Sequence, residues 1–152
     1  MPLKKIILFI ATGAGVGYVP LFPGTLGSLV GVVLFFLLKD LKPISYLITL
    51  VTFSFFACWV STQAEIFFGK KDSQKIVLDE VVGMLVTLAG ISFSWSSVVL
   101  GFILFRLFDI WKPYPIRLCQ DRLPRGWGVV GDDVVAGIYA NLLMRFILCV
   151  WK

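Results

Sequence analysis

The sequence predicts an all-α, polytopic membrane helix bundle: about five helices arranged as hairpins, with a glycine- and proline-rich N-terminal interfacial segment. Of the 152 residues, 59% are hydrophobic and only 15% are charged, and the mean hydropathy is +0.93. Soluble domains have about 45–50% apolar and about 25% charged residues. Long charge-free stretches recur along the chain, and its basic residues gather in groups. The length fits one domain, residues 1–152.

The first element is a segment rich in glycine and proline, TGAGVGYVPLFPGTLGS at residues 12–28. This composition disfavours a continuous spanning helix. Backbone outside helices persists at membrane depth only where protein or a water-filled cavity satisfies its polar groups. We therefore expect an interfacial or re-entrant turn that leads into the first helix and lines a site.

Charge-free apolar stretches then define the helices. A spanning helix needs about 20 apolar residues, with a range of about 17–25. The first two stretches are expected to form a hairpin that turns at residues 39–43, and the last is expected to form the fifth helix. The stretches cover residues 26–38, 43–64, 81–105 and 134–151, the last one interrupted by Arg145.

The stretch at residues 81–105 decides the topology. As one helix, it would place Lys70, Lys71 and Lys75 on one side of the membrane and the basic residues at 112–125 on the other, against the positive-inside rule. Its centre reads GISFSWSS, a composition that favours a turn. We therefore predict a second hairpin, with one helix from about residue 75 to 91 and another from about 97 to 111.

This topology gathers the positive charge on one face. By the positive-inside rule this face is cytoplasmic. It holds residues 1–24, 63–76 and 112–133, which with Arg106 include ten of the 14 basic residues. The far side keeps Lys39, Lys42 and Lys152. Arg145 stays inside the last helix, where snorkelling toward the outer interface is the simplest interpretation.

Acidic residues adjoin the apolar helices on the same face. Ionisable groups at the edge of hydrocarbon are costly and suggest function by default. Structural interpretations stay open, because Asp132 suits a helix N-cap and the 79–80 pair suits a helix dipole. An all-oxygen cluster in a chain without histidine suits a hard cation such as Mg²⁺. The candidate metal-binding and catalytic residues are Asp79, Glu80, Asp109, Asp132 and Asp133.

Polar and basic residues near these acids are candidates for binding phosphate. Arg106 and Lys112 lie three residues on either side of Asp109, so each can neighbour it on a helix. Arg106 offers a planar fork to a phosphate, although a plain ion pair with Asp109 is an equal alternative. Thr25 and Ser28 open the first helix, where free backbone N–H groups favour anions.

Four motifs in order carry a family resemblance. They are the segment at residues 12–28, DSQKIVLDEVVG at 72–83, FRLFDIWKPYPI at 105–116 and GWGVVGDDVVAG at 126–137. On these motifs the chain resembles the bacterial phosphatidylglycerophosphatase A family over nearly its whole length. The resemblance implies Mg²⁺-dependent hydrolysis of phosphatidylglycerophosphate to phosphatidylglycerol and phosphate, in phospholipid biosynthesis. It also implies a multi-pass protein of the bacterial cytoplasmic (inner) membrane, with the site facing the cytoplasm and the acyl chains in the bilayer.

Two other classes of function stay open. A small cation-binding transporter or channel subunit could use the same acids as ion ligands, but these cluster at one end and no polar track crosses the membrane. A CDP-alcohol phosphotransferase-like enzyme would need a longer ladder of aspartates along its helices. Nucleic acid is a poor partner, because no long polar surface accompanies the basic groups.

Overall fold

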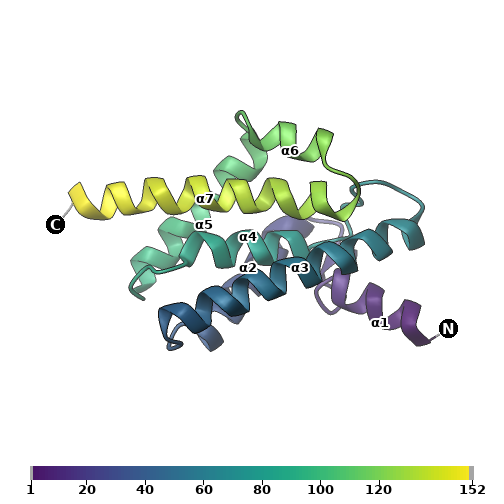
Figure 1. Ribbon diagram of the computed structural model, residues 1–152, viewed down its shortest axis with the longest axis horizontal. Helices are drawn as coiled ribbons and strands as arrows, with labels where there is room; N and C mark the ends of the chain where they lie inside the picture. The colour runs from purple at the N-terminus through teal and green to yellow at the C-terminus, as the bar shows by residue number, and fades with distance from the viewer. Residues whose placement is uncertain (1, 151–152) are drawn as a thin grey trace.

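The computed structural model describes residues 2–150 and is helical throughout, without strands in that range (Figure 1). This confirms the all-α class. Lys152 and the end of the last predicted helix lie outside the described residues. In chain order the elements are α1 (Pro2–Ala11), η1 (Val16–Tyr18), α2 (Pro23–Leu38), α3 (Pro43–Phe68), α4 (Leu78–Leu88), α5 (Trp95–Trp111), α6 (Ile116–Arg122) and α7 (Gly126–Val150).

The seven α-helices within residues 2–150 exceed the predicted number of about five, because α1 and α6 were not expected. Both were missed for the same reason: the prediction counted long charge-free stretches. α1 carries two lysines and only a short apolar run, yet it buries Ile7 and Ala11, and it packs on α3. α6 spans seven residues and includes three charged ones, so the sequence suggested a loop.

The two predicted breaks between helices are confirmed. α2 ends at Leu38 and α3 begins at Pro43, while α4 ends at Leu88 and α5 begins at Trp95. The second break has a clear local cause. The Ser94 hydroxyl accepts a hydrogen bond from the backbone N–H of Ser97 at 3.0 Å, which caps the start of α5.

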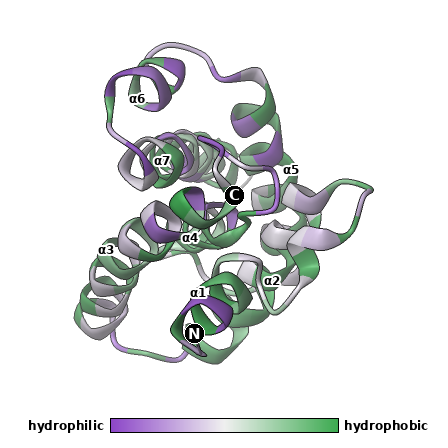
Figure 2. Cartoon of the chain, turned by 90° about the vertical axis from the view of Figure 1, so that its right-hand side faces the viewer, coloured by the Kyte–Doolittle hydropathy of each residue, from purple (hydrophilic) through white to green (hydrophobic). Residues whose placement is uncertain are grey.

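α4 is the central helix of the bundle. Figure 2 shows it surrounded by α2, α3, α5 and α7, and it packs on each of them. Its side chains Met84, Leu85 and Leu88 are fully buried. The approach of α7 is close enough to require glycine, because a Cβ on Gly137 would lie 2.5 Å from the carbonyl oxygen of Gly83. Because α4 is held by four neighbouring helices, the side chains of its first turn have fixed positions.

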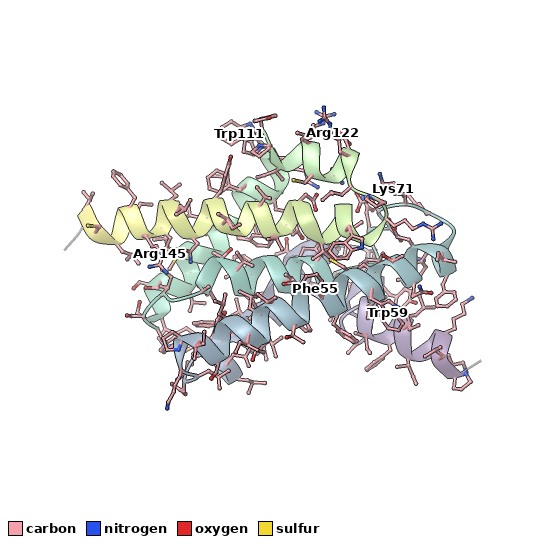
Figure 3. The ribbon with its side chains drawn as sticks, in the orientation of Figure 1. Phe55, Trp59, Lys71, Trp111, Arg122 and Arg145 are labelled. Carbon is pink, nitrogen blue, oxygen red and sulfur yellow. The ribbon has the colours of Figure 1, made fainter. Side chains whose placement is uncertain are left out.

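The outer surface of the bundle is apolar. α3 and α7 have 26 and 25 residues and are long and apolar enough to cross a membrane, and only 33% and 28% of their most apolar windows are buried. Phe55 and Trp59 project outward from α3 with 58% and 51% of their surfaces exposed (Figure 3). Apolar surface on this scale marks contact with lipid or with other proteins, and it indicates membrane association.

Candidate functional site

A polar cavity of about 240 Å³ lies at one end of the bundle, where α2, α4 and α7 begin and α5 ends. Seven of the nine residues predicted for the site line it. Together they are five carboxylates and two cations: Asp79, Glu80, Asp109, Asp132, Asp133, Arg106 and Lys112. The hairpin at residues 89–94 produces this convergence, since it returns α5 to the end at which α4 starts.

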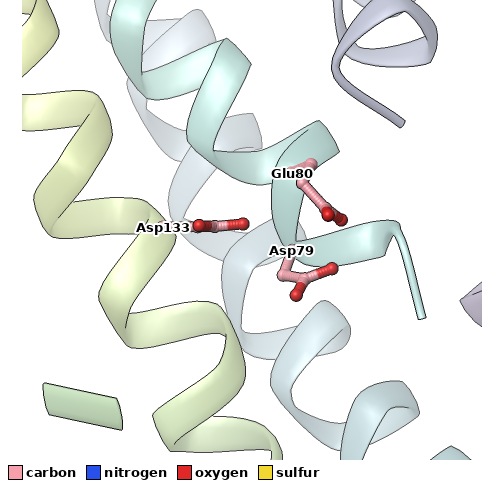
Figure 4. A group of neighbouring side chains, drawn as sticks. All are labelled: Asp79, Glu80 and Asp133. Atoms are coloured by element: carbon pink, nitrogen blue, oxygen red, sulfur yellow. The ribbon is translucent and has the colours of Figure 1, made fainter. Parts of the chain in front are cut away.

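Three of the carboxylates form a tight group (Figure 4). Asp79 and Glu80 come from the first turn of α4, and Asp133 reaches toward them from α7. One oxygen from each lies within 4.8 Å of the others. Asp79 and Asp133 are 8% and 3% exposed. Among the described residues, Asp79 Oδ1 and Glu80 Oε2 are buried without a hydrogen-bond partner.

Asp132, beside this group, is paired with a lysine. Lys112 Nζ lies 2.5 Å from Asp132 Oδ2, and the Asp132 side chain is 4% exposed. Lys112 does not pair with Asp109, as its spacing on one helix had suggested. It is the residue after α5 and takes a left-handed conformation with φ 46°, which turns its side chain from α5 toward α7. This ion pair therefore ties the end of α5 to α7.

The charge state of Lys112 follows from its surroundings. Burial by itself lowers the pKa of the ammonium group, but the carboxylates of Asp132, Asp133 and Asp109 outweigh it, so the pKa is raised above its ordinary value. Lys112 is thus charged at neutral pH, and its charge is already balanced by Asp132.

Arg106 is also paired, with Asp109 on the same helix face. Its Nη1 donates to Asp109 Oδ2, while its Nε is buried without a partner among the described residues. Gly24 at the start of α2 packs against this group: a Cβ there would lie 2.5 Å from Glu80 Oε1 and 3.1 Å from Arg106 Nη1. The sequence analysis placed Gly24 in the segment at residues 12–28 that was expected to line a site, but it did not predict this steric role.

The start of α7 rules out one structural interpretation. Asp132 was considered as a helix N-cap, on the expectation that the helix began near residue 134. α7 begins at Gly126, so Asp132 and Asp133 lie well inside the helix. Neither aspartate is needed there to cap the helix. The three glycines at 126, 128 and 131 had masked this first part of the helix, since glycine disfavours helix interiors.

Thr25 and Ser28, predicted to bind phosphate, lie outside the cavity lining, although both are within the described range. Ser28 is fully buried, and its hydroxyl donates to the carbonyl oxygen of Gly24 at 2.9 Å. The helix entry reaches the cavity through Phe22, Pro23 and Gly24 instead.

One acidic residue of the cavity was missed by the sequence analysis. Asp72 lies in the loop before α4, has φ 51° and lines the cavity. Its backbone N–H donates to Glu65 Oε1 at 2.7 Å, and its Oδ2 accepts from Gln120 Nε2 at 2.5 Å. The available signal was its position at the start of the motif at residues 72–83. It was passed over because it adjoins no apolar stretch.

The charges of the cavity do not balance. Arg106 and Lys112 each form an ion pair with one aspartate, and none of Asp79, Glu80 and Asp133 forms an ion pair among the described residues. Buried carboxylates that share a site repel one another and lose hydration. An all-oxygen donor set with unpartnered oxygens suits a hard divalent cation. The geometry therefore fits a metal-assisted reaction of an anionic substrate.

Comparison with known proteins bears on the identity of that substrate. The pattern that defines the family described as phosphatidylglycerophosphatase A matches residues 9–148. A Haemophilus influenzae protein named Phosphatidylglycerophosphatase A is 39% identical over 150 residues, covering 94% of this chain and 92% of the relative. An Escherichia coli protein of the same name is 34% identical over 139 residues, covering 91% and 81%.

A third relative carries a different name. It comes from Bacteroides thetaiotaomicron, is provisionally named as a phosphatidylinositol-3-phosphatase, and is 34% identical over 145 residues, covering 90% of each chain. No solved structure matches the chain significantly.

Proposed function

The chain belongs to the phosphatidylglycerophosphatase A family, and we propose that its acidic cavity is a Mg²⁺-dependent lipid phosphatase site. The reaction is hydrolysis of the terminal phosphomonoester of phosphatidylglycerophosphate, giving phosphatidylglycerol and phosphate. The observation that carries the proposal is the group of three carboxylates at the end of the bundle, of which Asp79 and Glu80 each have a buried oxygen without a hydrogen-bond partner among the described residues. A lipid substrate suits a cavity that opens in an otherwise apolar protein.

Asp79, Glu80 and Asp133 are the residues that would hold the metal ion, with Asp109 and Asp132 nearby. When bound, Mg²⁺ supplies the positive charge that offsets these carboxylates and the phosphate oxygens. The protein's remaining task is mainly positioning and charge stabilisation, because phosphoryl transfer demands little covalent chemistry.

The two cations have separate roles in this proposal. Arg106, whose Nη1 donates to Asp109 Oδ2, lines the cavity and offers the charge of its guanidinium group to the phosphate. Lys112, held by Asp132, adds a second positive charge at the cavity wall. The oxygen of the attacking water bonds to phosphorus, and one carboxylate of the cavity accepts the proton that this water loses. The bond from phosphorus to the glycerol oxygen breaks, and the same carboxylate returns the proton to that oxygen, which leaves as a hydroxyl.

Phosphate release from purified protein tests the proposal. We expect turnover of phosphatidylglycerophosphate with Mg²⁺, loss of turnover in a chelator, and recovery on adding Mg²⁺ back. Phosphotransferase activity is assayed in parallel with a CDP-activated lipid and an alcohol acceptor. Phosphatidylinositol 3-phosphate is assayed as a further substrate, because the Bacteroides relative is named for it. Full turnover in the chelator, or turnover of only the CDP-activated lipid or only phosphatidylinositol 3-phosphate, contradicts the proposal.

We further propose a multi-pass arrangement in the bacterial cytoplasmic membrane, with the cavity facing the cytoplasm. The turns at residues 39–42 and 89–94 lie at the end opposite the cavity. Reporter fusions after Lys71 and after Arg122 should both report cytoplasm, and a fusion after Leu41 should report the other side. Opposite locations for the first two fusions would contradict the shared site.

A further inference from the structure

We infer that Phe22 determines the preference of this site for lipid phosphates, because it marks where the glycerol and acyl part of the substrate leaves the cavity. This inference rests on the proposed phosphatase function and adds a specificity residue that the family assignment does not name. Phe22 directly precedes α2 and lines the cavity that holds the carboxylates. It takes no part in the proposed chemistry, so its role would be recognition.

The lining of the cavity singles out Phe22. Most of the lining is polar, and of its large apolar side chains Ile76 is 2% exposed and faces the protein interior. Phe22 is the one large apolar side chain of the described lining that is exposed, at 74%. It therefore touches both the acidic cavity and the surroundings of the protein, which is the boundary that a lipid phosphate must straddle.

The size of the cavity requires such an exit. Its volume of about 240 Å³ suits a phosphate-bearing headgroup and is too small for two long acyl chains. The chains must leave over an apolar rim, since crossing polar groups would cost their hydration. Ile110 and Trp111 beyond Asp109 are similarly exposed, at 73% and 70%, but neither lines the cavity. The rim at Phe22 is the side that is both apolar and continuous with the phosphate site.

The backbone holds Phe22 in an unfavourable conformation. Its φ and ψ are 54° and 52°, in the left-handed region that a bulky residue rarely adopts. The following Pro23 restricts it further, and no side-chain hydrogen bond caps the helix here. Residues held this way gather at binding sites, where the surrounding structure fixes them. Asparagine or glycine would suit this conformation better. The backbone therefore does not explain the phenylalanine, and a role of its side chain in binding does.

Substitution of Phe22 separates apolar recognition from phosphate binding. The variants are Phe22→Ala, the conservative Phe22→Leu, and Leu21→Ala as the matched control, since Leu21 is 67% exposed but does not line the cavity. Each is assayed with a diacyl lipid phosphate in mixed micelles for KM and kcat. Competitive inhibition by inorganic phosphate is measured in parallel, because phosphate occupies only the polar part of the site.

We expect Phe22→Ala to raise KM about tenfold or more, because an aromatic contact with the apolar part of the substrate is lost. The value of kcat should stay nearly unchanged. The inhibition constant of phosphate should not move. Phe22→Leu should recover most of the lost affinity, and Leu21→Ala should match the wild type. Equal effects of Phe22→Ala and Leu21→Ala, or an equal weakening of lipid and inorganic phosphate by Phe22→Ala, would overturn the inference. Failure of the wild type itself to hydrolyse any lipid phosphate would instead overturn the proposed function.

Discussion

The two ends of α4 differ in whether their buried polar groups are hydrogen-bonded. At its start, Asp79 and Glu80 keep carboxylate oxygens that are buried without a hydrogen-bond partner among the described residues. At its end, Asn141 Nδ2 lies 2.8 Å from the carbonyl oxygen of Thr87 and 3.0 Å from that of Ala89. Arg145 Nη2 donates to the same Ala89 oxygen at 2.9 Å, and its Nε donates to Asn141 at 2.8 Å.

This contrast distinguishes a site from a structural cap. The last carbonyl groups of a helix lack partners within the helix, and side chains that satisfy them stabilise the fold. For Arg145 the sequence suggested only snorkelling, and the structure adds a structural role: Arg145 lies on α7, away from the end where Lys71 lies (Figure 3), and caps α4. The carboxylates at the other end are left unsatisfied at a cost in stability, which a bound cation would repay.

The largest effect is expected at the unsatisfied end. Asp133→Asn removes one charge from the group of three, so turnover should fall roughly a hundredfold or more, as for the loss of a transition-state charge stabiliser. The free energy of unfolding without metal should stay equal or rise, because a buried repulsion is relieved. Phosphate release and thermal unfolding in detergent check both. A parallel loss of activity and stability would mean that Asp133 is a structural residue.

Asp109 differs from Asp133 because it forms an ion pair, with Arg106. If it only balances Arg106, Asp109→Asn should change turnover little; if it also serves the metal or phosphate, the loss should again be roughly a hundredfold. We expect the severe loss in a protein that is still folded and inserted in the membrane. Asp40→Asn and Asp121→Asn are the controls: Asp40 pairs with Lys39, and both residues are exposed and outside the cavity. Mild and equal effects at all three positions would place the site elsewhere.

Asn141→Leu tests the satisfied end. The leucine cannot donate to the carbonyl groups at the end of α4, so the free energy of unfolding should fall by about 1–3 kcal/mol. Turnover per folded molecule should remain near the wild-type value, since the cavity lies at the other end of α4. Measurement needs unfolding curves and rates normalised to folded protein. Loss of turnover at unchanged stability would show that this end takes part in the reaction.

Arg145→Met should have the smallest effect. Arg145 is exposed, and a cation at a helix C-terminus contributes about 0.3–1 kcal/mol. Asn141 would still reach the carbonyl groups, so the variant should unfold at a slightly lower temperature and keep its activity. A larger destabilisation than that of Asn141→Leu would show that Arg145, and not Asn141, is the main cap.

The features of the fold and site that depend on local sequence pattern could be predicted. The serine-rich break at residues 90–97 separated α4 from α5, and this break brought Asp109 to the same end as Asp79. What it could not predict depends on tertiary packing. The pairing of Lys112 with Asp132 requires a left-handed residue at the end of α5, which no periodicity reveals. The role of Gly24 needs the positions of Glu80 and Arg106, which come from two other helices.

Direct metal binding tests the central claim that Asp79, Glu80 and Asp133 form a cation site. Mn²⁺ can stand in for Mg²⁺, and its free concentration is followed by electron paramagnetic resonance during titration of the purified protein. We predict that the wild type binds Mn²⁺, that Mg²⁺ displaces it, and that Asp133→Asn weakens binding strongly while Asp121→Asn does not. Equal Mn²⁺ binding by the wild type and Asp133→Asn, or no binding by the wild type, would contradict the account.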